Sequence, residues 1–408
     1  MRFLALAACL SFFFTSCGHA FAEDVPRSLP GDRMLEAMAL VRSLSLEEKC
    51  GQVLLVGVKG RGEADPESLA LVESLQPGGI VLFGFNVPDK AAELGTTIGA
   101  YQDAVSRKQG RAALPLLMAI DHEGGSVFRF KGGVTRLPSA AEAGARGEAY
   151  VGLLGARAGL ELRALGLNLA LAPVVETSSG SARDFLGTRA YSREGSQADA
   201  ASGAFIQGLE SVGIAAAAKH FPGNSATDPH EDLPRLVAGL DELERQYYPR
   251  FASAIERGVS VILLSHILVP ALDSKRPVTV SRGIVTGVLR EKLGFKGLIV
   301  TDDLFMKGLA RQFPPERGAI EALAAGADLL MLSSSLSATR IRDALKRAVS
   351  SGVVPIERLE EAAARVVELK LRLGLAAALD PAERAARLAA LPSIVEESRS
   401  RIEASRKH

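Results

Sequence analysis

The sequence predicts an α/β fold, a (β/α)8 barrel of the TIM type that forms a single domain. Apolar runs of strand length alternate with longer amphipathic segments along most of the 408 residues. Several of these runs are continuously apolar, which is typical of parallel strands buried on both faces. Charged and turn residues follow several runs, and barrel enzymes place their chemistry at such strand ends.

The first residues are expected to be an export signal and not part of the barrel. Arg2 is followed by an apolar run over residues 3–14, which is too short to span a bilayer as a stable helix. Two processing sites compete. Cleavage after Ala22 would make residues 1–22 a signal peptide, whereas a lipobox-like sequence ending at Cys17 would leave this cysteine lipidated. Either route predicts an exported chain, periplasmic or anchored by lipid in the cell envelope.

Composition narrows the expected partners and excludes a disulfide. The formal net charge of +1 gives no reason to expect nucleic acid. No Trp is present and aromatic residues are only 5%, which favours a small pocket over a long sugar-stacking cleft. Cys9 and Cys17 both fall in the export signal, so Cys50 has no intrachain partner in the mature protein.

The expected elements follow one another along the chain from residue 30 to residue 375, the predicted barrel domain. Residues 33–43 are a predicted helix, and Ser45 with Glu48 is a capping box for a second, short one. The predicted strands are residues 52–58, 79–83, 116–121, 168–174, 213–219, 261–266, 298–302 and 328–332. The predicted helices between and after them include residues 90–108, 150–164, 197–211, 240–257, 284–293, 315–325 and 337–350.

Two segments complete the chain. Residues 356–373 are expected to form a closing helix that packs across the barrel. Residues 376–408 are rich in Ala, Arg and Glu with a weak apolar face, which predicts a surface helix followed by a frayed end. There is no internal repeat and no low-complexity linker, so one domain is predicted.

Polar residues at the end of the third strand are candidates for binding hydroxyl groups. Asp121 ends this strand, Gly124 and Gly125 follow it, and Arg129 comes soon after. The glycine pair lets the backbone approach a ligand, while Asp121 and Arg129 offer an acceptor and a donor. A plain βα turn with a surface arginine explains the same residues.

Two adjacent carboxylates, Asp302 and Asp303, end the seventh strand. Both cannot be buried after an apolar run without a large cost in free energy. One of them is explained as an N-cap of the segment 304–309. The other is then expected to point into the mouth of the barrel.

The fifth strand leads into a stretch dense in charged and turn residues, from Lys219 and His220 to Asp228 and His230. If the chain is locally extended there, Asp228 and His230 share a face, and the carboxylate can orient the imidazole and favour its charged form. A solvated loop is the plain alternative. His220, His230 and His266 could also be drawn as metal ligands, but their spacings match no dense ligand motif, so no metal or other cofactor is predicted.

Taken together, these segments resemble glycoside hydrolase family 3, of the single-domain β-N-acetylglucosaminidase (β-hexosaminidase) type. The resemblance runs from Leu44 to about Leu373. Its matching segments are residues 45–52, 78–83 with Asn86, 121–130, 171–174, 219–223 and 293–302. One departure is the loop 224–227, which is shorter than the usual loop of the family and bears on where His230 sits.

The resemblance implies a retaining mechanism through a covalent glycosyl-enzyme. It implies Asp302 as the nucleophile, His230 as the acid/base and Asp228 as the partner that orients it. The positions that it implies for binding the terminal sugar are Asp121, Arg129, Arg189, Lys219 and His220. Arg189 lies in the weaker match over residues 187–192.

The implied activity is removal of terminal non-reducing GlcNAc from peptidoglycan fragments or chito-oligosaccharides by an exo-acting, monomeric enzyme. A related β-glycosidase, such as a glucosidase or xylosidase, is the second interpretation. The family's Asp-x-His dyad and the absence of a second domain from this sequence count against it. A non-catalytic envelope protein that binds sugar is the third. Phosphorolysis also stays open as a side reaction, because a neutral imidazole repels phosphate less than a carboxylate does.

Overall fold

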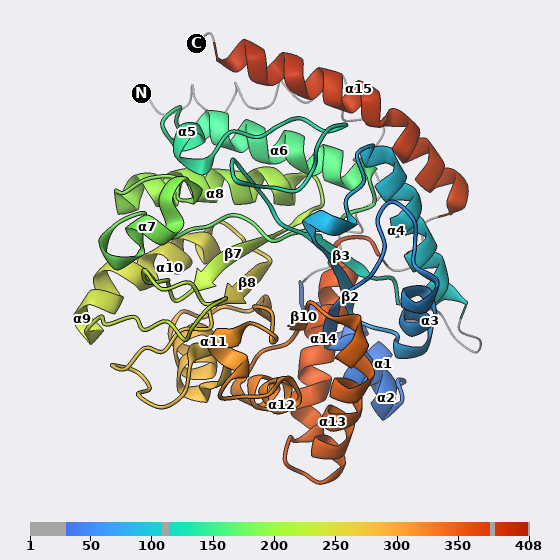
Figure 1. Cartoon of the computed structure of the whole chain (residues 1–408), viewed down its shortest axis with the longest axis vertical. Helices are drawn as coiled ribbons and strands as arrows, with labels where there is room; N and C mark the ends of the chain where they lie inside the picture. The colour runs from blue at the N-terminus through green and yellow to red at the C-terminus, as the bar shows by residue number, and fades with distance from the viewer. Residues whose placement is uncertain (1–29, 108–113, 376–379, 407–408) are drawn as a thin grey trace.

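The computed structural model describes residues 30–107, 114–375 and 380–406 and shows a barrel of eight parallel strands (Figure 1). Its strands are β1 (Leu54–Gly57), β2 (Gly79–Leu82), β3 (Leu117–Ile120), β6 (Leu169–Ala170), β7 (Ala215–Phe221), β8 (Val261–Leu264), β9 (Leu298–Thr301) and β10 (Leu330–Leu332). Their order follows the chain, and β10 pairs with β1. A parallel bridge between Val300 and Leu329 closes the ring between β9 and β10. The predicted fold class is confirmed.

Helices cover the outside of the barrel in the connections between strands and directly after β10. They are α3 (Pro66–Leu75), α4 (Ala91–Ser106), α5 (Ala140–Gly144), α6 (Glu148–Ala164), α7 (Arg183–Leu186), α8 (Gly195–Ser211), α9 (Leu240–Glu242), α10 (Tyr248–Glu256), α11 (Lys307–Ala310), α12 (Pro315–Ala325) and α13 (Ala338–Ser350). Between β8 and β9 the predicted helix 284–293 is π-helical instead, over Gly283–Lys292. The predicted elements include neither α3 nor the antiparallel pair β4 (His122–Gly124) and β5 (Val127–Phe128) that follows β3.

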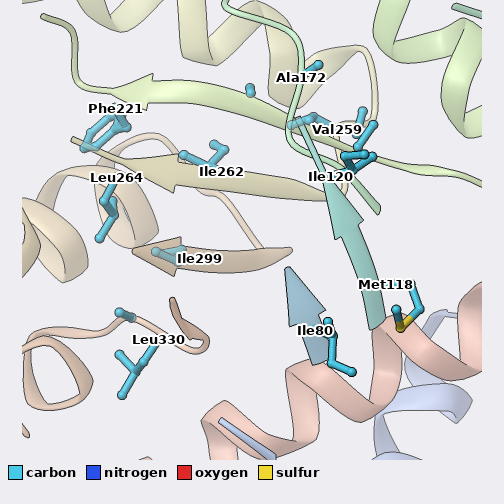
Figure 2. Close-up of a cluster of buried hydrophobic side chains, with 14 of the residues drawn as sticks. Ile80, Met118, Ile120, Ala172, Phe221, Val259, Ile262, Leu264, Ile299 and Leu330 are labelled. Atoms are coloured by element: carbon cyan, nitrogen blue, oxygen red, sulfur yellow. The ribbon is translucent and has the colours of Figure 1, made fainter. Parts of the chain in front are cut away.

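Side chains of the strands alternate between the barrel interior and the surrounding helices, because successive residues of a strand point to opposite faces. Along β3, Leu117 and Ala119 belong to the inner cluster, whereas Met118 and Ile120 belong to the outer one. Figure 2 shows members of the outer cluster, among them Ile80, Met118, Ile120, Ala172, Phe221, Val259, Ile262, Leu264, Ile299 and Leu330.

The end at which the strands begin is closed by α14 (Ile356–Arg372). Val366 and Leu369 of this helix are buried in the inner cluster of the barrel, so the predicted closing helix is confirmed. Lys370 is fully buried beside them and donates to Gln52 Oε1 at 2.7 Å. Burial lowers the pKa of Lys370 to about 7, because the apolar surroundings disfavour its charged form.

Within the described residues, two helices precede the barrel, α1 (Pro30–Arg42) and α2 (Leu46–Gln52). The predicted capping box of α2 is present. Ser45 Oγ accepts from the backbone N–H of Glu48, and the Glu48 carboxylate accepts from the backbone N–H of Ser45 at 2.8 Å. Cys50 of α2 is a buried free thiol, and burial raises its pKa to about 12.

The described part of the C-terminal tail is one long helix, α15 (Pro381–Ser405), which lies along α6 and α4 outside the barrel (Figure 1). Leu391, Val395 and Ile402 are its buried apolar residues. Arg157 of α6 donates to Ser398 Oγ at 3.1 Å, so a polar contact fixes the helix as well. Residues 376–379 and 407–408 lie outside the described residues.

The predicted export signal, residues 1–22 with Cys17, also lies outside the described residues. Across the three described ranges, none of the helices has both the length and the apolarity that crossing a membrane requires.

Candidate active site

Three of the predicted site residues occupy the next inward position beyond the apolar interior of the barrel. Ala119, Ala217 and Val300 belong to the inner cluster, and two residues further along each chain segment come Asp121, Lys219 and Asp302. Because strand side chains alternate, these polar side chains continue the inner row at the carboxyl ends of β3, β7 and β9. The strand ends therefore gather them at one mouth of the barrel.

Asp121 and Lys219 form the centre of an ionic network. Asp121 accepts from Lys219 Nζ at 2.8 Å through one carboxylate oxygen and from Arg129 Nη2 at 2.8 Å through the other. Burial raises the pKa of Asp121, but Lys219 and Arg129 together hold it well below its usual range. The structure thus brings Arg129 and Lys219, two of the residues predicted to bind the sugar, into contact with Asp121.

Lys219 also contacts a carboxylate outside the predicted site set. Glu123 in β4 lies 2.7 Å from Lys219 Nζ and accepts two hydrogen bonds from Arg189, from Nε and Nη2, both at 2.8 Å. Burial lowers the pKa of Lys219, but Asp121 and Glu123 outweigh this effect and raise it, so the ammonium stays charged. Two carboxylates and three cations therefore form one continuous network, and Arg189 is part of it.

His220 is held from the neighbouring strand end by Glu176, which follows β6. Glu176 Oε1 accepts from the backbone N–H of His220 and from ring Nδ1, both at 3.0 Å. The same carboxylate accepts from the backbone N–H of Asn224 at 2.6 Å and from its side chain at 2.8 Å. Glu176 thereby fixes both His220 and the first residue of the short loop 224–227.

Asp228 and His230 meet in a turn, so the condition of extended backbone is not met, but the carboxylate still reaches the imidazole. Asp228 Oδ1 accepts from the backbone N–H of His230 at 2.9 Å and lies 2.7 Å from ring Nδ1. Pro229 between them favours such a turn because its ring fixes φ. Since an ionised carboxylate only accepts, Nδ1 carries the proton and Nε2 is the nitrogen left to exchange one.

The turn that carries this pair is attached to α11, the helix that follows the end of β9. The backbone N–H of Gly308 donates to the carbonyl oxygen of Pro229 at 3.0 Å. Two exposed ion pairs accompany this bond, Lys307 with Glu231 and Arg311 with Asp232. The segment after Asp302 and the loop of His230 are therefore neighbours in space.

Asp302 and Asp303 have different environments. Asp303 Oδ1 accepts from the backbone N–H of Ser333 at 2.8 Å and from that of Phe305 at 3.2 Å. Burial raises the pKa of Asp303. Asp303 therefore holds the turn after β9, whereas the one hydrogen bond of Asp302 recorded for the described chain comes from the backbone N–H of Asp303, at 2.9 Å.

His266 follows β8 and interacts with residues of the segment after β9. It is fully buried, with Nδ1 2.6 Å from Thr279 Oγ1 and Nε2 2.9 Å from the carbonyl oxygen of Asp303. A carbonyl only accepts, so Nε2 carries a proton. Burial lowers the pKa of His266, while the charge of Asp302 opposes that shift and the charge of His230 adds to it. A neutral His266 thus sits within electrostatic reach of both predicted catalytic groups.

Each histidine considered above as a metal ligand has a partner of its own. Over the described ranges, no group of three or more His, Cys, Asp or Glu side chains is arranged to hold a metal ion. A cavity of about 520 Å³ under α15 is lined by Asn168 and Gly213, which precede β6 and β7. It lies at the opposite end of the strands and is not part of this site.

Residue patterns alone did not single out Glu123, Glu176 or Asn224. Glu123 lies two residues after Asp121, and Glu176 two residues after Val174. Both follow predicted strands, so their position alone could have marked them as candidates for the site. Asn224 carried none, because its role depends on the packing of its loop against Glu176.

The region of the chain that carries these site residues resembles known proteins. Residues 45–369 match the model of the glycosyl hydrolase family 3 N terminal domain. A β-hexosaminidase A from Pseudoalteromonas piscicida is 30% identical over 396 residues, covering 88% of this chain. A β-hexosaminidase from Methylococcus capsulatus is 35% identical over 284 residues, which cover 67% of this chain and 81% of that protein.

Solved structures agree. A glycoside hydrolase family 3 β-N-acetylglucosaminidase from Paenibacillus sp. str. FPU-7 is 30% identical, with a TM-score of 0.78 over 86% of this chain and 69% of that one. The chain spans 64% of the length of the Pseudoalteromonas protein, less than two thirds of it.

Proposed function

Because this chain belongs to glycosyl hydrolase family 3, we propose that it is a retaining, exo-acting β-N-acetylglucosaminidase. The pair of Asp228 and His230, held beside the segment that follows Asp302, is the observation that carries the proposal. Relatives named β-hexosaminidase and β-N-acetylglucosaminidase support it. The roles of the individual residues remain predictions.

In the proposed first step, Asp302 attacks the anomeric carbon while His230 gives the proton on Nε2 to the leaving glycosidic oxygen. The bond to the leaving group breaks and a covalent glycosyl-enzyme forms. Asp228 accepts from Nδ1 and so leaves Nε2 as the nitrogen that passes the proton in this step. In the second step, neutral His230 takes a proton from water, whose oxygen attacks the anomeric carbon and releases the carboxylate of Asp302.

The terminal sugar is proposed to bind in the ionic network below these groups. Asp121 offers a carboxylate to sugar hydroxyls, and Arg129 and Lys219 offer donors around it. His220, whose Nδ1 faces Glu176, offers ring Nε2. Lys219 and Arg129 already fix the two oxygens of Asp121, so the acceptor is preorganised. The proposed substrates are peptidoglycan fragments or chito-oligosaccharides with terminal GlcNAc. An exported monomer, periplasmic or anchored through a lipidated Cys17, is part of the proposal.

The first experiment measures turnover of 4-nitrophenyl β-N-acetylglucosaminide beside the corresponding glucoside and xyloside. We expect a strong preference for the N-acetyl substrate in the wild type and a large loss in His230→Ala. Turnover of the glucoside or xyloside alone would replace the proposal with the second interpretation. If the wild type turns over none of the three but binds GlcNAc, the protein is a sugar-binding member without catalysis.

A further inference from the structure

Phe85 is an exposed aromatic residue at the mouth of the barrel. Among the described large apolar residues that are exposed, it alone is aromatic, and 60% of its surface is accessible. Its ring stacks on that of Phe83, with ring centroids 5.8 Å apart and planes 12° apart. A side chain this exposed adds little to the core, since it removes little apolar surface from water.

The position of Phe83 fixes where this pair lies. Val81 belongs to the inner cluster, so Phe83, two residues on, continues the inner row and packs against that cluster. Phe85 lies parallel to Phe83 and further from the core, in the turn Gly84–Asn86 that follows β2. The pair therefore extends outward at the same end of the barrel as Asp121 and Asp302.

The pair is also next to the proposed sugar-binding network. A Cβ added to Gly84, the residue between the two rings, would lie 3.6 Å from Arg129 Cδ. Arg129 in turn donates to Asp121 at 2.8 Å. The aromatic pair thus lies beside the outer edge of this network, on the side of Arg129.

The turn that presents Phe85 is held rigidly. Asn86 is buried, and its side-chain oxygen accepts from the backbone N–H of Phe83 at 3.0 Å. Its amide nitrogen donates to the carbonyl oxygens of Val58 and Gly60, both at 2.9 Å. The β2 turn is therefore tied to the β1 turn, so a ligand covering Phe85 would order little backbone on binding.

We propose that Phe85, backed by Phe83, is the platform that binds the leaving-group sugar, the pyranose joined to the terminal residue by the bond that is cleaved. This inference rests on the proposed function and names a subsite of it. A pyranose presents C–H groups on one face and hydroxyls at its rim, so it covers an aromatic ring while the hydroxyls stay in water. The polar network suits the terminal sugar, and an exposed aromatic beside it suits the next one.

Two substrates separate this subsite from the rest of the reaction. N,N′-diacetylchitobiose has a sugar as its leaving group, whereas β-N-acetylglucosaminyl fluoride has a leaving atom too small to reach Phe85. We expect Phe85→Ala to lower kcat/KM for the disaccharide about tenfold, mainly through KM, and to change the fluoride reaction less than twofold. Phe85→Tyr, which keeps the ring, should restore the disaccharide reaction.

Val353→Ala is the matched control, because Val353 is 67% exposed and lies between α13 and α14. It should change neither reaction. An equal loss on both substrates in Phe85→Ala, or no loss on either, would overturn the platform.

A binding measurement keeps the two proposals distinguishable. In Asp302→Asn, calorimetry should give a lower Kd for the disaccharide than for GlcNAc, and adding Phe85→Ala should raise only the disaccharide value. If wild type hydrolyses neither substrate, the proposed function fails, and this comparison still decides the platform. If the disaccharide Kd is the same in the double variant as in Asp302→Asn, Phe85 is not the platform for the leaving-group sugar.

Discussion

Gly308 lies against Pro229 so closely that a Cβ on Gly308 would be 2.8 Å from the Pro229 carbonyl oxygen and 2.7 Å from that of Asp232. Its N–H donates to that same Pro229 oxygen at 3.0 Å. Both neighbours are backbone atoms of the turn that carries His230. The absence of a side chain at Gly308 therefore sets the distance between this turn and the segment after Asp302.

Gly308→Ala should displace the His230 turn and weaken proton donation more than sugar binding. A misplacement of about 1 Å at a catalytic group can cost about a hundredfold in rate. We expect kcat/KM, which reports the first step, to fall by about tenfold to a hundredfold for phenyl β-N-acetylglucosaminide, whose poor leaving group depends on a proton. The 2,4-dinitrophenyl analogue, whose leaving group needs none, should lose much less.

Gly318→Ala is the control for this variant. Gly318 lies in α12, and a Cβ there would meet its nearest atom at 3.4 Å, an ordinary contact. It should leave both rates unchanged. Equal losses on the two substrates in Gly308→Ala would mean that the glycine supports the fold and does not position His230.

Replacing each of the two adjacent aspartates by asparagine tests which one is the nucleophile. Asp303→Asn keeps an oxygen that can accept from Ser333 and Phe305, so we expect kcat within about tenfold of wild type. Asp302→Asn removes the attacking carboxylate and should lower kcat by at least about a thousandfold without changing the thermal midpoint much. The reverse ranking in steady-state kinetics would assign the nucleophile to Asp303.

Removing the ammonium at the centre of the network should destabilise the fold. In Lys219→Met, part-buried Asp121 and buried Glu123 lose a partner each, which costs about 3–5 kcal/mol of unfolding free energy for such pairs. Lys307→Met, at an exposed pair with Glu231, should cost about 1 kcal/mol or less. Urea unfolding at pH 7 compares the two.

The pH dependence gives this prediction a sign. In wild type, Lys219 helps to lower the folded pKa of Asp121, so the carboxylate contributes stability at neutral pH that is lost on acidification. In Lys219→Met the buried carboxylates gain from protonation, so the deficit should shrink as the pH falls toward 4. A deficit that is the same at pH 7 and pH 4.5 would show that lost packing causes it.

The sequence alone predicts which residues line the mouth of the barrel, because every second residue of a strand faces the interior. The inward positions after Ala119, Ala217 and Val300 are polar, and the structure places all three at one mouth. Asp65 and Pro66 also carried the local signal of α3, an N-cap followed by proline. That helix was predictable.

The contacts that align the site were not predictable from local pattern. Pro229 and Gly308 are far apart in sequence, and only the packing of two loops brings them together. Glu176 acts on Asn224 for the same reason. Asp228 and His230 do make contact as expected, but through the turn that Pro229 favours and not through extended backbone.

Lys370 should make the stability of the protein depend on pH. Its folded pKa is lowered to about 7 from an ordinary value of 10.5, so between these values the unfolded chain binds a proton that the folded one does not. The contribution of Lys370 to unfolding free energy should therefore rise with pH by about 1.4 kcal/mol per unit from pH 7 toward pH 10.

Lys370→Met should be compared with wild type by urea unfolding at pH 7, 8 and 9. It removes the titrating amine but leaves Gln52 Oε1 without its donor, which costs about 1–3 kcal/mol at every pH. The difference between the two proteins isolates Lys370, since the other groups titrate in both. The unfolding free energy of wild type minus that of Lys370→Met should increase as the pH rises. A difference that is constant over these pH values would mean that Lys370 stays charged in the folded barrel, with Gln52 as a sufficient partner.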